Sequence, residues 1–329
     1  MQTFQLNPSL SIISNPNLKK IRFGHLAPHA FEMEDNFDQI EAVINQLKSQ
    51  RQLLRTEIIN IVESNFTESA SQIVDDLINL KIIVPYHCAS ERYARHKLYY
   101  QNGNFPLDAQ DLLATKSILL IGVGGIGSTC ATLLNAAGIG GLILADSDKV
   151  ELSNLTRTTL FEQTDISFSK VEKAKEQLKR RNSTTQIECI PEILTQKTYS
   201  VFAKAFERTD LVILSGDSGP ELHKQVYQLS IQTNTPIMNS GYIETHGVIG
   251  PITLGKNQCR EDEIKQLASA DIQLNPNYQA PSYGPLNSLV SSITVNEVIR
   301  YFLTPQETKT LNNRLVISSW DYQQIWEAY

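Results

Sequence analysis

Apolar residues recur with a helical period in residues 36–80 and with strand-like spacing on either side of that stretch. Within it they return every three or four positions, which predicts three amphipathic helices. Short runs of β-forming residues, separated by Asn and Pro turns, come before the helices, and another run comes before Pro85. We therefore predict a small winged-helix-like α+β domain over residues 1–86. Its predicted strands are 3–6, 11–14, 20–23 and 81–84, and its predicted helices are 36–49, 53–63 and 67–80.

From residue 117 onward, apolar runs with the length of buried parallel strands alternate with amphipathic stretches. The alternation predicts an α/β fold over residues 87–329, with a Rossmann-like and mostly parallel sheet. A strand–turn–strand pattern after residue 240 adds an antiparallel part, and the aromatic C-terminal sequence predicts a packed strand. The other predicted strands are 117–121, 142–145, 185–190, 210–214, 236–239 and 314–319, and the predicted helices begin near 126, 170, 196, 222 and 286.

Residues 257–283 form a polar segment that is long for a connection inside a compact domain. Segments of this length are usually functional or disordered. We expect this one to be a substrate or crossover loop that covers the active site and orders when the substrate binds.

A glycine-rich loop directly follows the first predicted strand of the second part. Gly122, Gly124, Gly125 and Gly127 allow a tight turn, close approach of the backbone to a phosphate, and close contact between helix and strand. The N-terminus of the next helix faces that phosphate. Asp146 stands at the end of the next strand, where a carboxylate meets a ribose hydroxyl. The loop by itself also suits dehydrogenases and flavoproteins.

Several polar and charged residues follow Asp146 closely, among them Asp148, Asn154 and Arg157. Lys170 begins a highly charged helix whose other charges are explained by a solvated face. A cation at a helix N-terminus is disfavoured by the helix dipole. The unfavourable position of Lys170 therefore indicates a role in ligand binding.

Two further positions suggest phosphate chemistry. Asp217 falls just beyond the fourth predicted strand, where a carboxylate can hold Mg²⁺ against phosphates or can cap the next helix. The segment 88–108 reads as a linker and contains Arg92 and Arg95 around a tyrosine. These arginines either belong to a solvated helix start or reach a phosphate, for which the guanidinium is suited.

Composition narrows the possible partners. The formal net charge is −6, and this disfavours a general electrostatic attraction of the chain to nucleic acid or to anionic membranes. No apolar run approaches the roughly 20 residues that span a bilayer, and the first residues lack the pattern of a signal peptide. We therefore expect a cytoplasmic protein that binds neither nucleic acid nor membrane.

The four cysteines are widely scattered and form no CxxC pair. They support neither a structural zinc site nor a disulfide framework, so we expect reduced thiols and no zinc.

Acidic residues outnumber basic ones in residues 1–86, and no basic recognition helix is present, so DNA binding is disfavoured for the first domain. From composition alone, we favour a packing or dimerisation module. The alternative is a peptide clamp, in which a bound peptide adds a strand to an exposed sheet edge.

The motifs of the second part resemble, as a set, those of the ubiquitin-activating (E1-like) and ThiF/MoeB adenylating family. They are Gly-Val-Gly-Gly-Ile-Gly, Asp-Ser-Asp-Lys-Val-Glu-Leu-Ser-Asn-Leu-Thr-Arg, Ser-Lys-Val-Glu and Ser-Gly-Asp. The resemblance covers about residues 90–300 and implies an enzyme that binds ATP with Mg²⁺, adenylates a carboxylate and releases pyrophosphate.

The resemblance also implies a role for each matching residue. The four glycines match the phosphate loop, Asp146 matches the ribose carboxylate, and Asp148 and the segment 153–157 match the part near the phosphates and metal. Lys170 matches the lysine that steadies the phosphates, and Asp217 matches the Mg²⁺ ligand. The implied cofactor-binding residues of that segment are Ser153, Asn154 and Arg157, and the implied catalytic residues are Arg157, Lys170, Asp217 and Arg95.

Arg92-Tyr-Ala-Arg95 resembles the family's Arg-Tyr-x-Arg signature, whose second arginine reaches the partner subunit's ATP. The resemblance thus implies a homodimer in which Arg95 acts in trans. An N-terminal domain of strands and helices before such a core resembles the peptide-modifying branch that makes microcin C and pantocin A. That branch implies a ribosomally made precursor peptide as substrate, with activation of glutamate side chains, condensation and dehydration.

The chain also departs from the family's pattern. The family usually has two CxxC pairs that hold zinc, whereas here only Cys259 matches the first pair and the second is absent. Thr158 and Ser169 replace the usual Gln and Pro. Three alternatives stay open: an activator of a sulfur-carrier protein, a non-catalytic peptide-binding scaffold and a dehydrogenase. The missing zinc cysteines and the extra N-terminal domain disfavour the first of them.

Overall fold

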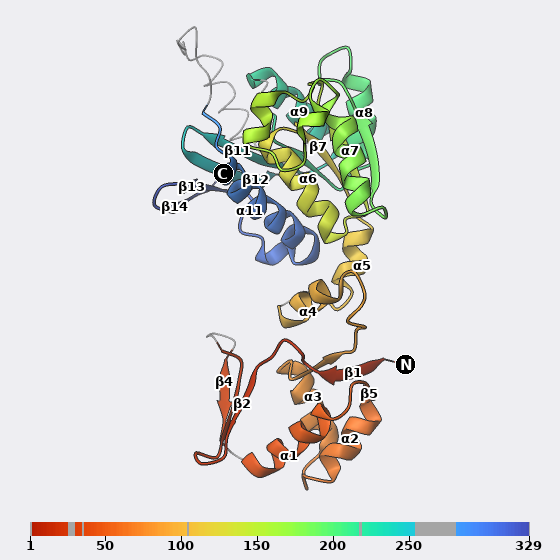
Figure 1. The fold of residues 1–329 in the computed structure, drawn as a ribbon, viewed down its shortest axis with the longest axis vertical. Helices are drawn as coiled ribbons and strands as arrows, with labels where there is room; N and C mark the ends of the chain where they lie inside the picture. Colours follow the sequence, from red (N-terminus) through yellow and green to blue (C-terminus); the bar gives the residue numbers. More distant parts are fainter. Residues whose placement is uncertain are drawn as a thin grey trace. The chain divides into compact units, whose positions relative to one another are not determined.

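The computed structural model describes residues 2–25, 30–34, 36–103, 105–216, 219–253 and 281–328. The predictions made for Asp217, Cys259 and residues 257–280 therefore concern parts of the chain outside the described residues. The chain divides into two compact units, Met1–Leu107 and Asp108–Tyr329, which are coloured red to orange and yellow to blue (Figure 1). Each unit is described by itself.

The first unit contains helices and two three-stranded antiparallel sheets, in the orders β5-β1-β6 and β2-β3-β4. Its core is formed by apolar side chains from both sheets and the helices, including the buried Phe23, Ile44, Ile58 and Val74. The predicted α+β character of this unit is confirmed. The elements are β1 (Thr3–Leu6), β2 (Ile12–Asn15), β3 (Lys20–Phe23), β4 (Phe31–Met33), α1 (Phe37–Lys48), β5 (Leu53–Leu54), α2 (Arg55–Glu63), α3 (Ala70–Asn79), β6 (Ile83–Pro85) and α4 (Ala94–Asn102).

Three details of this unit differ from the prediction. Strand β4 was not predicted. The helix expected from residue 53 begins at Arg55, because Leu53 and Leu54 pair with β1. Pro85 belongs to β6 instead of ending the strand before it, and this is possible because β6 is an edge strand, where a missing N–H costs no ladder hydrogen bond.

The first unit extends beyond residue 86. The segment that reads as a linker forms helix α4, and its last residue holds the helix to the rest of the unit. The side chain of Asn7 donates to Asn102 Oδ1 over 2.7 Å, and Lys81 Nζ donates to the Asn102 carbonyl over 3.0 Å. Their contacts therefore group residues 87–107 with the first unit, whereas we assigned these residues to the second domain.

The second unit is built on an eight-stranded sheet in the order β14-β13-β12-β11-β10-β7-β8-β9. Strands β7 to β11 are parallel, and β12, β13 and β14 extend the sheet in antiparallel fashion. The predicted Rossmann-like, mostly parallel α/β fold is confirmed. Its strands are β7 (Ser117–Ile121), β8 (Gly141–Ala145), β9 (Gln186–Ile190), β10 (Leu211–Leu214), β11 (Ile237–Ile243), β12 (His246–Thr253), β13 (Asn313–Ser318) and β14 (Gln324–Ala328).

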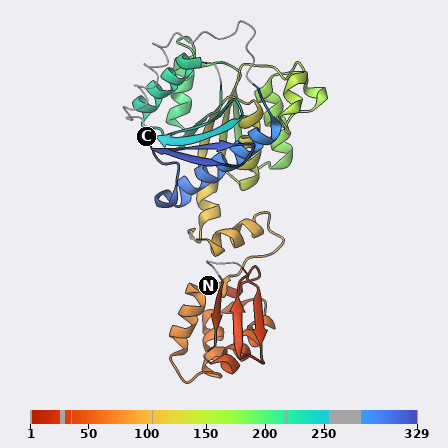
Figure 2. The ribbon, with the colours of Figure 1, turned by 90° about the vertical axis from the view of Figure 1, so that its left-hand side faces the viewer.

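Helices lie on both faces of this sheet and cover its parallel strands (Figure 2). On one face, Leu119 of β7 packs in a buried cluster with Phe206 of α8 and Val226 of α9. On the other face, α11 packs against α6, β11 and β12. The helices are α5 (Ala109–Ala114), α6 (Gly125–Ala137), α7 (Lys170–Arg181), α8 (Tyr199–Glu207), α9 (Gly219–Thr233) and α11 (Gly284–Leu303), with 3₁₀ turns η1 (Leu152–Thr156), η2 (Gln163–Asp165) and η3 (Pro305–Glu307).

The aromatic C-terminal segment forms a strand, as predicted, but it is not packed. Trp326 of β14 is 43% exposed, because β14 is the edge of the sheet and pairs only with β13, and Trp320, which lies in the turn before β14, is 80% exposed. Among the helices of the described ranges, none is both long enough and apolar enough to cross a membrane.

Candidate active site

A cavity of about 560 Å³ opens at the carboxyl ends of the central parallel strands of the second unit. It lies where the strand order reverses, since the chain proceeds from β7 to β8 on one side and reaches β10 on the other side. Open α/β sheets bind ligands at this position. Eight residues identified from the sequence line the cavity: Gly122, Gly124, Gly125, Asp146, Asp148, Asn154, Arg157 and Lys170.

The glycines of the loop after β7 have different functions. Gly122 has a φ of +92°, and a Cβ there would lie 2.6 Å from the backbone nitrogen of Gly216. A Cβ on Gly127 would lie 1.9 Å from the Gly122 carbonyl oxygen, whereas a Cβ on Gly124 would meet nothing within 4 Å. Gly124 thus leaves open space for a ligand. Gly127 does not line the cavity and instead allows α6 to approach the loop closely.

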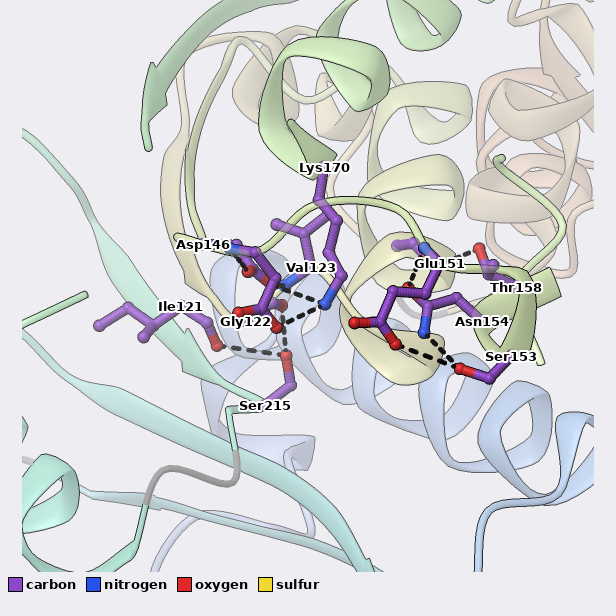
Figure 3. A network of polar contacts seen from close by, with 12 residues as sticks. Ile121, Gly122, Val123, Asp146, Glu151, Ser153, Asn154, Thr158, Lys170 and Ser215 are labelled. Carbon is purple, nitrogen blue, oxygen red and sulfur yellow. Dashed lines mark hydrogen bonds and ion pairs between the residues drawn. The ribbon is translucent and has the colours of Figure 1, made fainter. Parts of the chain in front are cut away.

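The carboxylate of Asp146 is fixed by backbone N–H groups at the end of β8. Its Oδ2 accepts from the N–H of Val123 over 2.7 Å, and its Oδ1 accepts from the N–H of Asp148 over 2.8 Å (Figure 3). The side chain is 10% exposed and lines the cavity. Asp146 therefore holds the glycine loop in place and presents a fixed negative group to the cavity.

Lys170 is buried at the first position of α7, and two carboxylates compensate its charge. Its Nζ lies 2.8 Å from Asp148 Oδ2 and 3.8 Å from Asp146 Oδ2. Figure 3 shows the side chain reaching down from the helix toward Asp146. From the sequence, the unfavourable position of a cation at a helix start indicated a role in ligand binding. In the structure the two aspartates compensate the charge, and Lys170 also faces the cavity.

The turn after β8 is held by its own polar side chains. Asn154 is 9% exposed, and its Oδ1 accepts from the N–H of Glu151 over 3.1 Å. The Arg157 guanidinium donates to the Ser153 carbonyl over 2.6 Å. Both Asn154 and Arg157 line the cavity, whereas Ser153 does not. Thr158 forms a buried hydroxyl contact of 2.9 Å to a serine of α6, which links this turn to the phosphate-loop helix.

Other cavity residues come from elements that no local motif connects to the glycine loop. Ser215, after β10, donates to the Gly122 carbonyl over 2.8 Å. Asn239 of β11 and Asn287 of α11 are buried, and the amide oxygen of each has no hydrogen-bond partner among the described residues. Arg314 lies on β13. Ser215 belongs to the Ser-Gly-Asp motif noted above. Asn287 and Arg314 belong to none of the motifs named above, and the sheet order and the packing of α11 bring them to the cavity. The cavity residues that sequence reasoning missed are Ile126, Glu151, Leu214, Ser215, Gly216, His223, Asn239, Ser240, Gly241, Tyr242, Ile243, Val248, Gly250, Ser282, Asn287 and Arg314.

Two predicted catalytic residues are not part of the described site. Arg95 is an exposed residue of α4 in the first unit. Asp217 follows Gly216, which lines the cavity, but Asp217 itself lies outside the described residues. The described part of the chain contains no group of three or more His, Cys, Asp or Glu side chains that could hold a metal ion.

The sheet order, the glycine loop and the cavity at the reversal point define an α/β protein with a nucleotide-binding type of site. The model of the ThiF family matches residues 98–328, and the chain belongs to this family.

Similar proteins agree with this class. The sulfur carrier protein ThiS adenylyltransferase of Escherichia coli is 31% identical over 162 residues, which is 49% of this chain and 62% of that protein. The chain thus spans less than two thirds of that relative. The structure of E. coli MccB with ATP matches with a TM-score of 0.77 and 25% identity, over 99% of this chain and 96% of that one. PaaA matches with a TM-score of 0.68 and 20% identity, over 82% and 96%.

Proposed function

We propose that this protein uses ATP to adenylate a carboxylate of a ribosomally made precursor peptide. One observation carries the proposal: Lys170 is buried beside Asp146 and Asp148, on the same cavity as Gly124 of the glycine loop. A dehydrogenase needs no cation at this position, whereas transfer to a phosphorus atom needs charge stabilisation there. The adenylyltransferase named among the relatives and the ATP in the MccB structure support the same chemistry.

In the proposed reaction, a carboxylate oxygen of the peptide attacks the α-phosphorus of ATP. A bond forms between the carboxylate oxygen and the α-phosphorus. The bond between the α-phosphorus and the oxygen that bridges it to the β-phosphorus breaks, and pyrophosphate leaves with that electron pair. We propose that Lys170 and Arg157, which line the cavity, stabilise the negative charge that spreads over the phosphate oxygens. The open space at Gly124 and the N-terminus of α6 hold the phosphates. Asp146 is the proposed ligand of the ribose hydroxyls.

A magnesium ion bound to the ATP phosphates would add further charge neutralisation. Mg²⁺ usually keeps several waters and takes one or two carboxylates together with phosphate oxygens, so a site without a cluster of three acidic or His/Cys groups can still accept it. We propose Asp217 as the protein ligand, because it is the residue after the cavity-lining Gly216. Asp148, whose side chain is 67% exposed beside the cavity, is a second oxygen donor.

The peptide part of the proposal rests on the first unit and on the branch that the sequence resembles. The relatives MccB and PaaA share the overall fold, and MccB has been solved in complex with N-formylated MccA. We propose that residues 1–86 bind the precursor, and that glutamate side chains are activated and then condense with loss of water, as in pantocin A biosynthesis. The alternative reaction is adenylation of the C-terminal carboxylate of the peptide in place of its glutamate side chains. We further propose a homodimer in which Arg95 reaches the partner's ATP.

The test combines the purified protein with ATP, Mg²⁺ and each short peptide encoded beside its gene. We expect AMP and pyrophosphate to form with one of these peptides, and the peptide to lose the mass of water. Lys170→Ala should abolish AMP formation and leave the fold intact. Unchanged peptide modification by Lys170→Ala would refute the role of Lys170. No nucleotide turnover with any of the peptides would refute the proposal, and peptide binding without turnover would indicate a non-catalytic scaffold.

A second candidate is activation of a sulfur-carrier protein, which the 31% identity to a ThiS adenylyltransferase favours. Its substrate would be a small protein ending in Gly-Gly. AMP formation with such a carrier, together with none for the peptides, would select this candidate.

A further inference from the structure

Part of the cavity wall is made by β11, the last parallel strand of the sheet, and by the antiparallel strands β12 and β13. This strand wall consists of the cavity-lining residues of these strands: Asn239, Ser240, Gly241, Tyr242, Ile243, Val248, Gly250 and Arg314. Among these described residues, only Arg314 is charged. The strand wall therefore presents one cation on an otherwise neutral surface.

Arg314 is well separated from the glycine loop along the sheet. The register aligns Ile121 of β7 with Leu214 of β10 and Asn239 of β11. The next residue of β11, Ser240, pairs with Ile249 of β12, which pairs with Leu315 of β13. Arg314 thus lies close to the level at which β7 ends, four strands away. With strands about 4.8 Å apart, the lateral separation is on the order of 19 Å. An anion at Arg314 is therefore a different group from the phosphates at the loop.

Arg314 is held by Glu327, its direct cross-strand partner on β14. Nε donates to Glu327 Oε2 over 2.8 Å, and Nη2 donates to the same oxygen. Because both contacts use one oxygen, this is not the two-oxygen fork that guanidinium and carboxylate prefer. The side chains are 27% and 41% exposed, so water weakens the pair. A ligand carboxylate in the cavity can therefore compete with Glu327.

We propose that Arg314 binds a second carboxylate of the peptide substrate, one that is not adenylated, and so selects acidic peptides. This inference rests on the proposed function, since it assumes that a peptide occupies the strand wall. In the alternative view, Arg314 and Glu327 form a structural cross-strand pair that only fixes the register of β14.

The experiment measures peptide binding by calorimetry, with and without α,β-methylene-ATP. The probes are short acetylated peptide amides with two glutamates separated by zero, one or two alanines, each paired with a copy that has glutamine in place of the second glutamate. We expect the two-glutamate peptide to bind about tenfold more tightly at one spacing or more. Arg314→Gln should remove this preference without changing nucleotide affinity.

Two variants separate recognition from structure. Glu327→Gln removes the competing carboxylate, so we expect it to bind the two-glutamate peptide at least as tightly as the wild type does. Arg208→Gln breaks a similar exposed pair, with Glu188 in the same unit, and should keep the preference. Loss of the preference in Glu327→Gln would show that the pair is structural and would overturn the inference.

The inference also fails if the wild type shows no preference for the second glutamate, whether both peptides bind alike or neither binds. Failure of the proposed function is recognised separately, because the wild type would then form no AMP with any of the peptides encoded beside its gene.

Discussion

Lys170→Met is the substitution that most directly tests the chemistry of the site. It removes the charge of a side chain that is buried at the start of α7 and faces the cavity. Removing one preorganised group that stabilises developing charge costs roughly 10²–10³ in rate, or about 2.7–4 kcal/mol. We expect this loss in the rate of ATP–pyrophosphate exchange, measured with the peptide that supports AMP formation.

The same substitution should change stability far less. Its nearest partner, Asp148, is 67% exposed, and a pair with one partner in water contributes about 1 kcal/mol or less. Asp146 keeps the two backbone hydrogen bonds that fix it. We therefore expect the free energy of unfolding of Lys170→Met to stay within about 1 kcal/mol of the wild-type value, as measured by urea denaturation.

Lys175→Met is the matched control, since it makes the same change on the same helix at a residue that does not line the cavity. It should leave the exchange rate within about twofold of the wild type. The reasoning is refuted if Lys170→Met retains more than a tenth of the wild-type rate. It is also refuted if Lys175→Met loses as much.

Three further substitutions or modifications test other parts of the structure. Gly127→Ala should lower the melting temperature strongly, because its Cβ would lie 1.9 Å from a backbone carbonyl oxygen. Gly124→Ala should fold normally, because its Cβ would meet nothing within 4 Å. Similar melting curves for the two variants would contradict this prediction. Burial acts to raise the pKa of the Asp165 carboxyl, but a backbone hydrogen bond and a lysine ion pair outweigh it, so the pKa lies below its ordinary value. The depressed pKa adds stability at neutral pH, and this stability is lost as the pH falls below about 4. In urea denaturation, the difference in stability between the wild type and Asp165→Asn should therefore shrink below that pH. A difference that stays constant with pH would contradict this prediction. Burial raises the pKa of the Cys130 thiol to about 12, whereas hydrogen bonding lowers the pKa of the exposed Cys88; iodoacetamide at pH 8 should therefore label Cys88 first, and equal labelling would exclude the described packing.

Local sequence predicted much of the phosphate side of the site. The glycines, Asp146 and Lys170 each stand at the end of a strand or the start of a helix, and such junctions are recognisable from hydrophobic periodicity. The carboxyl ends of parallel neighbouring strands meet at one sheet edge, so these residues are brought together by any right-handed β–α–β arrangement. The contact of Lys170 with Asp146 and Asp148 then follows from the order of β7, β8 and α7.

The peripheral predictions failed for a different reason. The sequence of the C-terminal segment is aromatic and β-forming, which correctly predicts a strand. Whether that strand is covered depends on its place in the sheet, and at the edge Trp326 remains exposed. Likewise, the segment before Leu107 contains polar residues typical of a linker, yet tertiary contacts of Asn102 hold it to the first unit.

The sequence by itself determined the α/β class of the second unit and the identity of the residues around the glycine loop, because short-range patterns encode both. Tertiary structure alone decided what completes the cavity. Asn239, Asn287 and Arg314 reach it from β11, α11 and β13, which are distant along the chain and adjacent only through sheet order and helix packing. Pairing of distant strands depends on the whole sheet, so no local pattern of these residues indicates a place in the site.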